Sequence, residues 1–331
     1  MTRSPMTVCR SISNSSGCSS MRLKPGLRYC VAAFLAAKAA VLAPQAHTET
    51  LDERLFSPRT GDQLSCADCH AEAKVIQGGK VGMGNRRADP LAISALIDAV
   101  SEEHIFSAAD PLDRDGDNIS GRVSWVLSLT DQRQVPGRFG WKASVGTLED
   151  QIANALITDM GLENALLTFS TATCSADEPG CVVAVASPVD AKEESALAIL
   201  AAEVRHLLTP QAKPDPGGVR LFTDTGCAAC HQPYMRGTEG RGLLLFTDLL
   251  LHDMGQELAE NRTVGTATQS EWRTASLLGF SQKAGLLHDG RAETIAQAVE
   301  AHGGEAQDSV TRFLALSETQ MLELLAFLRG L

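Results

Sequence analysis

Two five-residue stretches, Cys66-Ala-Asp-Cys69-His70 and Cys227-Ala-Ala-Cys230-His231, decide how the rest of this 331-residue chain is interpreted. In each stretch, two cysteines three positions apart are followed directly by a histidine. This spacing lets two thiols reach the two vinyl groups of one haem while the adjacent imidazole binds the iron. A zinc site would need two further ligands for each motif, and a redox dithiol needs no adjacent histidine. The two motifs therefore predict two covalently bound c-type haems.

The composition fits this interpretation and argues against other classes of protein. Hydrophobic residues make up 44% of the chain, which is ordinary for a globular protein and too high for a disordered one. Aromatic residues make up only 5%, so part of the core is expected to come from a group that is not an amino acid. Lys+Arg is 29 against Asp+Glu 40, a net charge of −11, which argues against a nucleic-acid partner.

The first 46 residues have the order of a secretory signal. Basic residues within 21–28 precede the apolar run 29–42, which ends in the small-residue segment 43–46. Lys38 interrupts the run, which favours a cleaved signal and a periplasmic protein over an uncleaved membrane anchor. Met21 is an alternative start, because the signal pattern begins there. Cleavage leaves 23 lysines and arginines against 40 acidic residues, a net charge of −17.

Two cysteines remain outside the haem motifs after this cleavage. Cys174 and Cys181 flank the turn Glu178-Pro-Gly180. In an oxidising compartment such a turn would close a small disulfide loop. Two free buried thiols are the alternative.

Residues 190–208 and 317–331 are predicted to form amphipathic helices. The first begins with an aspartate as N-cap, and the second with a capping box made by Ser317 and Gln320. Between them, the three prolines and two glycines of 209–218 argue against a helix and predict a linker. The apolar positions at helical spacing are Leu197, Ile199, Leu200 and Val204 in the first helix, and Met321, Leu324, Leu325 and Leu328 in the second.

These elements predict a mainly α fold. We expect two cytochrome c-like helical domains, 55–208 and 219–331, joined by the linker 209–218 and preceded by the signal peptide 1–46. Each domain is expected to wrap around one covalently bound haem.

The two predicted domains contain a faint internal repeat with a constant offset of 147 residues. Segment 141–151 aligns with segment 288–298. At the same offset, His302 in the second domain falls opposite Ala155 in the first. His302 is therefore the predicted sixth ligand of the second haem, whereas the first haem has only a methyl group at this position. A missing sixth ligand leaves iron open to a small molecule, which is typical of an enzyme rather than an electron relay.

Several longer motifs resemble the bacterial di-haem oxidoreductase family, which is often labelled thiol oxidoreductase or peroxidase. That family is similar to bacterial di-haem cytochrome c peroxidases and to the di-haem enzyme that matures the methylamine dehydrogenase cofactor. The resemblance covers roughly residues 55–331. Its motifs occur in order: Asp113-Arg-Asp-Gly-Asp-Asn-Ile-Ser-Gly-Arg122, Gly137-Arg-Phe-Gly-Trp-Lys-Ala143, Thr247-Asp-Leu-Leu-Leu-His-Asp-Met-Gly255, Glu271-Trp-Arg-Thr274, Leu287-His-Asp-Gly-Arg-Ala292 and His302-Gly-Gly-Glu-Ala306.

The resemblance to the peroxidases implies roles for individual residues. In those enzymes a His-Asp-Gly motif lies fourteen residues before the sixth ligand of the C-terminal haem, and His288 again selects His302 by this spacing. They also place a tryptophan between the haems and, ten positions later, a glutamine in the N-terminal haem pocket. Trp141 and Gln151 match these two positions.

Two positions depart from the peroxidase pattern. Ala155 stands where those enzymes have a proline, and Gly161 stands where they have the glutamate that acts as acid–base in splitting peroxide. Asp159 is the nearest substitute for that glutamate. This departure puts peroxide in doubt as the substrate.

The acidic turn 113–118 is a candidate calcium site. Its carboxylates alternate, as they do in calcium-binding loops, but it lacks the bidentate glutamate of an EF-hand. An Asp-rich turn with glycine is also common without an ion. The resemblance adds that related di-haem enzymes hold calcium between their haem domains. The candidate ligands are Asp113, Asp115, Asp117 and Asn118.

Five further residues are weaker candidates. His288 is expected near the interface of the haems. Arg273 and Arg291 would suit haem propionates, because guanidinium groups bind carboxylates in a bidentate manner, and ordinary salt bridges are the alternative. His252 and Met254 lie in a motif that could approach the second haem. A histidine next to an aspartate, however, more often belongs to a structural hydrogen-bond network.

We therefore expect an exported di-haem oxidoreductase of the cytochrome c peroxidase type. Electrons from a small, basic donor protein such as a cytochrome c would enter at the C-terminal haem, bound by His231 and His302. They would pass Trp141 to an open N-terminal haem, bound by His70, and reduce peroxide or another small substrate. The alternative is a di-haem electron-transfer cytochrome with no catalytic haem, in which Met83 closes the first iron.

Overall fold

The structure is a computed structural model, and it describes residues 66–70, 75–76, 86–170, 183–186, 191–207, 213–280 and 285–331. Contacts divide the chain into two compact units, Met1–Arg54 and Leu55–Leu331, and every described residue belongs to the second. The predicted signal peptide, Met83 and the pair Cys174 and Cys181 lie outside the described residues. No helix in the described part combines the length and the apolar character needed to cross a membrane.

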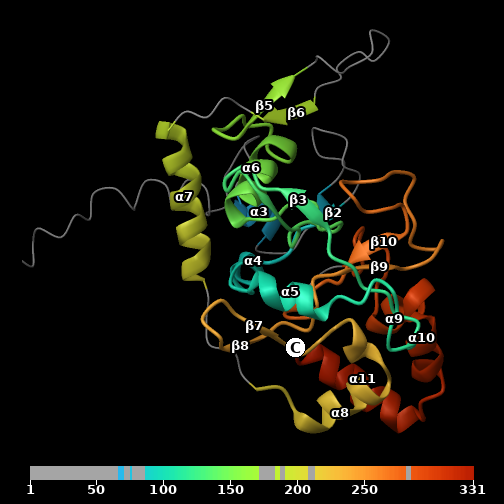
Figure 1. Ribbon diagram of the computed structural model, residues 1–331. Coiled ribbons are helices and arrows are strands. Elements are labelled where there is room, and N and C mark those ends of the chain that lie inside the picture. The colour runs from blue at the N-terminus through green and yellow to red at the C-terminus, as the bar shows by residue number, and fades with distance from the viewer. Residues whose placement is uncertain are drawn as a thin grey trace, which may run out of the picture. The chain divides into compact units, whose positions relative to one another are not determined.

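Helices dominate the described residues, as the mainly α prediction required (Figure 1). The bounds are α3 (Cys66–His70), α4 (Leu91–Asp98), α5 (Glu102–Ala108), α6 (Leu148–Thr158), α7 (Ala191–His206), α8 (Pro216–Asp224), α9 (Ile295–Glu300), α10 (Gln307–Leu314) and α11 (Glu318–Arg329), with 3-10 turns η2 (Cys227–Ala229) and η4 (Gly304–Ala306).

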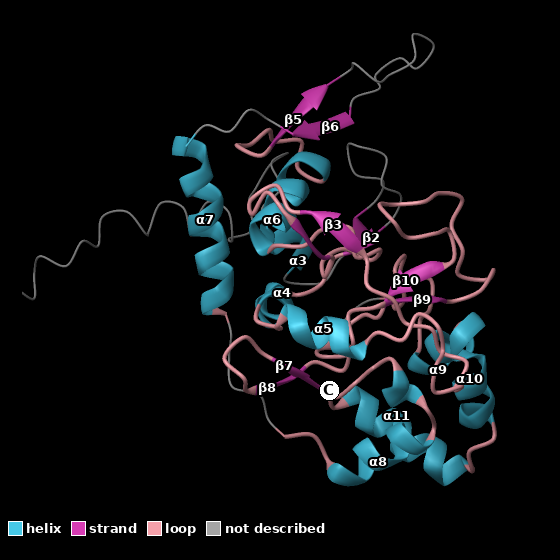
Figure 2. Cartoon of the chain, viewed as in Figure 1, coloured by secondary structure: helices cyan, strands magenta, loops and turns pink. Residues whose placement is uncertain are grey.

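Short antiparallel strand pairs, which the sequence did not predict, connect these helices (Figure 2). The pairs are β1 (Val75–Ile76) with β2 (Arg86–Arg87), β3 (Trp125–Leu127) with β4 (Gln134–Pro136), β5 (Leu167–Ser170) with β6 (Val183–Ala186), β7 (Tyr234–Arg236) with β8 (Gly242–Leu244), and β9 (Leu251–Asp253) with β10 (Glu271–Arg273). At two to four residues each, the strands are too short for an alternating pattern to stand out in the sequence.

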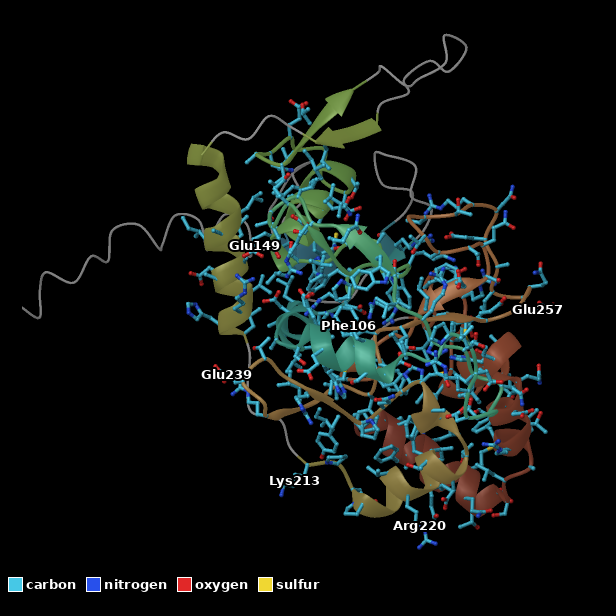
Figure 3. The ribbon with its side chains drawn as sticks, in the orientation of Figure 1. Phe106, Glu149, Lys213, Arg220, Glu239 and Glu257 are labelled. Atoms are coloured by element: carbon cyan, nitrogen blue, oxygen red, sulfur yellow. The ribbon has the colours of Figure 1, made fainter. Side chains whose placement is uncertain are left out.

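The predicted helix at 190–208 is α7, and it packs against α4 and α6. The predicted apolar positions Leu197, Leu200 and Val204 are buried, at spacings of three and four. Ile199 was predicted with them but is 46% exposed, because it lies off that face. In Figure 3, Glu149 of α6 lies beside α7, where its carboxylate pairs with Arg205 at 2.8 Å.

The predicted linker is wrong at its C-terminal end, because residues 216–218 form the first turn of α8. Pro216 occupies a first-turn position, where a missing N–H costs nothing and the fixed φ suits a helix. Asp215 is the N-cap, and its carboxylate accepts a hydrogen bond from the Gly218 N–H at 2.7 Å. The Pro-Gly-Gly sequence thus starts a helix here instead of preventing one.

The predicted C-terminal helix is confirmed as α11, with the capping box of Ser317 and Gln320 in place. It lies beside α8, and a Cβ at Gly218 would come within 2.1 Å of the Phe327 ring. Phe327 also meets Phe222 and Phe246, each with ring centroids 5.9 Å apart. Glycine therefore allows the two helices to approach closely over a small aromatic cluster.

The main hydrophobic core is continuous between the two sequence halves. It joins buried residues of α4 and α5, such as Leu96 and Ile105, to buried residues that follow the second haem motif, such as Phe246 and Leu324. A smaller cluster around Ala153 and Leu166 lies under α7. The division into two haem domains at 209–218 stays a prediction.

The internal repeat predicted from the sequence is present in the backbone. Thr147 caps α6 and Thr294, 147 residues later, caps α9, each through a hydrogen bond from the N–H three positions on. The isolated bridges Phe139↔Val145 and Leu286↔Ala292 are related by the same offset. So is the left-handed conformation of Gly140 and Leu287, with φ of 72° and 69°. The two segments therefore share a local fold.

Candidate functional site

The second haem motif lines an apolar cavity of about 200 Å³. Cys227, Cys230 and His231 reach it from the end of α8 and the η2 turn, and His302 reaches it just after α9. The apolar lining residues include Phe222, Leu258, Phe280, Leu286, Ile295, Val299, Val310 and Leu328. The structure therefore brings the predicted ligand pair into one cavity.

His231 and His302 are both prepared to bind a metal through Nε2. Nδ1 of His231 lies 3.0 Å from the Phe246 carbonyl, and Nδ1 of His302 lies 2.6 Å from the Ala298 carbonyl. Because a carbonyl only accepts hydrogen bonds, both Nδ1 atoms carry protons. Burial lowers the pKa of His302 and lowers the pKa of His231 to about 4, where the charge of His302 adds to the effect. Both rings are therefore neutral near pH 7, with Nε2 lone pairs available.

Burial disfavours the thiolate form of the motif cysteines for which a pKa shift is resolved. Burial raises the pKa of Cys66 and Cys230, and it raises the pKa of Cys227 to about 11. Redox-active and metal-binding cysteines need the thiolate, which these environments disfavour. Without a bound metal, these thiols are therefore protonated near pH 7.

His252 belongs to a buried hydrogen-bond network, in which Cys230, Asp248 and His252 each place one possible ligand atom within 4.8 Å of the others. Its Nε2 lies 2.9 Å from Asp248, and its Nδ1 lies 2.7 Å from Glu305 and 3.7 Å from the sulfur of Cys230. Burial alone would lower the pKa of His252, but its hydrogen bonds and the charge of Asp248 outweigh burial and raise the pKa well above its usual value. With a carboxylate at each nitrogen, the ring is an imidazolium without a free lone pair. Met254 does line the cavity.

Glu305 is a site residue that the sequence analysis missed. It lies three residues after His302, and its carboxylate accepts hydrogen bonds from the backbone N–H of Ser120 and of Asp253, in addition to His252. A Cβ at Gly304 would come within 2.1 Å of the Asp253 carbonyl, so this loop packs tightly on the strand that carries His252. The contacts anchor the segment next to His302. The quoted motif His302-Gly-Gly-Glu305 was the signal that could have revealed it.

The first haem motif lies at another cavity, of about 130 Å³. Below, this is the first cavity, and the cavity at the second haem motif is the second cavity. His70 lines it, and its Nδ1 lies 2.5 Å from the Asp89 carbonyl, so this ring also presents Nε2. One face of α6 supplies the lining at spacings of three, four, seven and eight: Gln151, Asn154, Ala155, Thr158 and Asp159. Within the described residues, His70 is the only histidine that lines this cavity.

The structure places the predicted residues Gln151 and Asp159 in this cavity together with His70. Burial raises the pKa of Asp159, partly offset by a hydrogen bond from Thr158 and by the charge of His70. Oε1 of Gln151 is buried and has no hydrogen-bond partner in the described structure. Asn154 and Thr158 were missed, although the helical spacing from Gln151 could have identified both.

Gly161, which replaces the expected glutamate, terminates α6 instead of lining the cavity. Its φ is +70°, a left-handed conformation that a glutamate would adopt only with strain. It does not line the described part of either cavity. The only acidic side chain that α6 and its C-cap direct into this cavity is Asp159.

A wall of three side chains, Arg87, Trp141 and Arg273, lines both cavities. The indole N–H of Trp141 donates to the Arg87 carbonyl at 2.8 Å, and the Arg273 backbone N–H donates to the Trp141 carbonyl at 2.9 Å. Trp141 thus contributes to the lining of both cavities, and its place between two haems stays a prediction.

Two buried cations of this wall suit anionic groups. Nη1 of Arg87 is buried with no hydrogen-bond partner in the described structure, and burial lowers the pKa of both Arg87 and Arg273. Haem propionates would satisfy such groups. Arg291 was predicted for the same role but lies outside both cavities, where it pairs with Asp289 at 2.7 Å on the surface.

Next to the wall, His288 stacks on a second tryptophan. The ring centroids of His288 and Trp272 are 3.9 Å apart, and Trp141 meets His288 edge-on at 6.3 Å. Burial lowers the pKa of His288 to about 4, so the ring is neutral. Lys142 covers the Trp272 ring, with Nζ 3.6 Å from the centroid. His288 and Trp272 line the second cavity and not the first.

The acidic turn brings Asp113, Asp115 and Asp117 together, with one carboxylate oxygen of each within 4.8 Å of the others. The predicted ligand Asn118 enters the turn differently, because its backbone N–H donates to Asp113 at 3.1 Å. The carboxylates are solvent-accessible and already accept backbone hydrogen bonds. Calcium at this turn stays a prediction.

The residues of both cavities fit a haem group. The second cavity combines two thiols, two neutral imidazoles and an apolar lining. The first cavity combines the His70 imidazole with a polar face of α6. Arg87 supplies a buried donor without a partner in the described structure to the wall that lines both cavities. Such an arrangement can hold two redox groups with a tryptophan between them.

Comparison with known proteins identifies a family for the chain. The family profile described as "Di-haem oxidoreductase, putative peroxidase" matches residues 62–331. A structure of hydrazine synthase from Kuenenia stuttgartiensis, pressurised with 20 bar xenon, is 15% identical, covers 83% of each chain and has a TM-score of 0.42. A MauG-like protein associated with microbial copper homeostasis is 15% identical, covers 78% of this chain and 93% of its own, and has a TM-score of 0.37. No curated protein matches the chain.

Proposed function

Because the chain belongs to the di-haem oxidoreductase family, we propose that it is an exported peroxidase-type enzyme with two covalently bound c-type haems. In this proposal each haem sits in a cytochrome c-like helical domain. The residues of the second cavity would hold a haem that supplies electron transfer, and the residues of the first cavity would hold a haem that supplies the reaction with peroxide or another small substrate.

The observation that carries this proposal is the difference between the two cavities. His231 and His302 both face the second cavity with available Nε2 atoms, and two strong ligands suit an electron-transfer haem. In the first cavity, Ala155 occupies the position that corresponds to His302. An iron bound there by His70 would keep its other face open toward Gln151 and Asp159.

The side chains of the first cavity would bind the substrate and move protons. When bound, the haem iron supplies the one-electron redox chemistry that these side chains lack. Reduction of one hydrogen peroxide to two waters consumes two electrons and two protons. Asp159, whose pKa burial raises, is suited to hold a proton and donate it to the departing oxygen. Gln151 would orient the substrate through its amide.

The wall between the cavities would carry the electrons. Trp141 lines both cavities, and its hydrogen bonds to the backbone at Arg87 and Arg273 fix the ring there. Electrons would come from a small basic protein such as a cytochrome c, because the exported chain has a net charge of −17 by the residue counts given above. Such steering predicts rates that fall as salt rises.

Electron paramagnetic resonance of the holoprotein, fully ferric and half-reduced, with and without peroxide, tests the proposal. We expect one low-spin signal and one high-spin signal that disappears with peroxide in the half-reduced protein. Two low-spin signals in both redox states, unaffected by peroxide, would instead support a di-haem electron-transfer cytochrome. In that case a residue outside the described segments, such as Met83, would close the first iron.

Calcium at Asp113, Asp115 and Asp117 is part of the proposal. The turn lies next to Ser120, whose backbone N–H binds Glu305 beside His302. Calorimetric titration of calcium into the chelator-treated protein, with an Asp115→Asn variant as the control, would detect the site. Identical, weak heats in both proteins would remove calcium from the cofactors.

A further inference from the structure

Trp272 is enclosed between a neutral ring and a buried cation. One face stacks on His288 at 3.9 Å with an interplanar angle of 20°. The Lys142 ammonium nitrogen lies 3.6 Å from the ring centroid, and the Arg86 guanidinium carbon lies 5.4 Å from it. A cation at this distance from a desolvated indole is strongly attracted to the ring while the ring is neutral.

Lys142 is fixed in this position by the surrounding backbone. Its side chain is 2% exposed, and Nζ donates hydrogen bonds to the carbonyls of Thr268, Gln269 and Glu271 at 3.1, 3.0 and 2.6 Å. Glu260 lies 3.7 Å away, and its carboxylate is shared with Arg86 and Arg262. Burial lowers the pKa of Lys142 to about 8, which still leaves most of the lysine charged at pH 7.

An oxidised Trp272 would have no base to relieve its charge. Its indole N–H donates to the Leu258 carbonyl at 3.0 Å, and a backbone carbonyl does not accept the proton itself. Loss of one electron would therefore leave a radical cation facing the Lys142 ammonium. The interaction that stabilises the neutral ring becomes a repulsion between like charges at short range.

Trp141 has the same indole group in a different electrostatic setting. The guanidinium carbon of Arg87 lies over its ring at 5.4 Å, farther than the 3.6 Å of the Lys142 nitrogen from Trp272. Both tryptophans touch His288, but Trp141 lines both cavities and Trp272 lines only the second. Lys142 thus lies over Trp272, the tryptophan that lines only one of the two cavities.

We propose that the Lys142 ammonium makes Trp272 harder to oxidise by one electron and thereby confines electron transfer between the two haem cavities to Trp141. This inference rests on the proposed function. In the step itself, Trp141 gives one electron to the oxidised group at the first cavity and receives one from the reduced group at the second. No bond forms or breaks, and no proton leaves the indole. Lys142 acts through Trp272, as a positioned charge, and does not touch the reacting groups.

The first test measures electron transfer between the haems of the full-length holoprotein by flash photoreduction, without peroxide. We expect Trp141→Phe to slow the transfer by at least about tenfold and Trp272→Phe to leave it unchanged. An unchanged rate in Trp141→Phe, or a slow rate in Trp272→Phe, would overturn the inference. Absence of inter-haem transfer in the wild-type protein would contradict the proposed function instead, so the two failures are distinguishable.

The second test removes the charge and keeps the hydrogen bonds. Lys142→Gln retains an amide donor for the carbonyls, Lys142→Arg retains the charge, and Lys213→Gln removes an exposed lysine as a matched control (Figure 3). Each holoprotein is exposed to a light-generated ruthenium(III) oxidant, and oxygen addition at Trp272 is measured by peptide mass spectrometry. We expect at least about tenfold more oxidised Trp272 in Lys142→Gln, and the wild-type amount in the other two. Equal oxidation in all four folded proteins would overturn the inference. If Lys142→Gln fails to fold, the two phenylalanine variants still decide it.

Discussion

Segments 139–159 and 286–306 begin with the same local backbone and direct different side chains into the two cavities. In each, a β-bridge and a left-handed residue precede a threonine that caps a short helix, α6 or α9. The α6 face directs Gln151, Ala155 and Asp159 into the first cavity. At the corresponding positions the second segment directs Ala298, His302 and Ala306 into the second cavity.

The comparison teaches that the two sites differ at all three corresponding positions, and that only the second segment has a histidine among them. The second helix face is apolar except for the histidine, as suits a closed redox centre. The first face is polar and lacks the histidine, as suits a substrate site. Because the backbones match, exchanging single side chains between the segments is a direct experiment on this difference.

The largest effect is expected from Ala155→His, which gives the first segment the ligand of the second. The imidazole would enter the first cavity, because Ala155 lines that cavity from α6 at the position that corresponds in the repeat to His302, which lies just after α9. We expect the high-spin signal to become low-spin and peroxide turnover to fall to about 1% or less. Ala155→Leu, which fills space without a ligand atom, is the control. A high-spin signal that persists in folded Ala155→His would contradict the equivalence of the two positions.

Asp159→Asn is the next largest change. The buried carboxyl, whose pKa is raised, would no longer exchange a proton with the substrate. We expect peroxide turnover to drop by at least about 10², with both spin states unchanged. Asp131→Asn, an exposed carboxylate on the surface, serves as the control. Wild-type turnover in Asp159→Asn would leave the first cavity without its proposed acid–base group.

The sequence was sufficient for the parts of these sites that follow a fixed spacing. The two Cys-X-X-Cys-His motifs, the offset of 147 residues and the capping box at Ser317 and Gln320 are local rules. The capping box located α11, the offset located the His302 position, and the helical spacing of apolar residues located α7, because each rule needs no knowledge of the tertiary contacts.

The residues that the sequence did not reveal depend on contacts between distant segments. Glu305 acts on His252 from 53 positions away, and Arg87 meets the carbonyl of Leu287 from 200 positions away. Within the motif 137–143, nothing in the sequence marks Lys142 as special. Its position depends on the carbonyls of Thr268, Gln269 and Glu271, which are more than 120 residues away in the chain. The Pro-Gly-Gly segment was misassigned as a linker because its N-cap, Asp215, was read as part of the linker.

His302→Ala is the reverse of the first exchange and should have a smaller effect on turnover. Removal of the second imidazole from the cavity leaves His231 as the one expected protein ligand. We expect the second haem to become high-spin while both haems stay covalently bound, as judged by absorbance and mass. Added imidazole should restore the low-spin spectrum. An unchanged low-spin spectrum would exclude His302 as a ligand.

Glu305→Gln tests the anchor that the first segment does not share, since Thr158 stands at the corresponding position. The amide keeps the size of the side chain but weakens its hydrogen bonds with the His252 imidazolium and the N–H groups of Ser120 and Asp253. We expect a partial high-spin population at the second haem, between wild type and His302→Ala. Asp308→Asn, on the exposed side of α10, is the matched control. Full low-spin character in Glu305→Gln would show that His302 needs no such anchor.

The smallest expected effect is a pH dependence of Trp272 oxidation in the wild-type protein. Burial lowers the pKa of Lys142 to about 8, with Arg86 adding to the decrease and Glu260 and Glu271 opposing it. As pH rises through 8, the ammonium on the Trp272 face loses its proton, so Trp272 should become roughly two- to tenfold easier to oxidise. His288, on the opposite face, has a pKa near 4 and stays neutral throughout.

The free energy of unfolding is an independent measurement of the Lys142 titration. Because the folded pKa of Lys142 lies below the unfolded value of about 10.5, the folded state holds this proton more weakly. Between pH 8 and the unfolded value, the unfolded chain therefore binds more protons, and the lysine penalises folding less as pH rises. Over this range, the free energy of unfolding of the wild type should therefore increase relative to that of Lys142→Gln as the pH rises. A constant difference between the two proteins, together with pH-independent oxidation of Trp272, would mean that Lys142 does not titrate there, and the contrast between the two tryptophans would then rest on geometry alone.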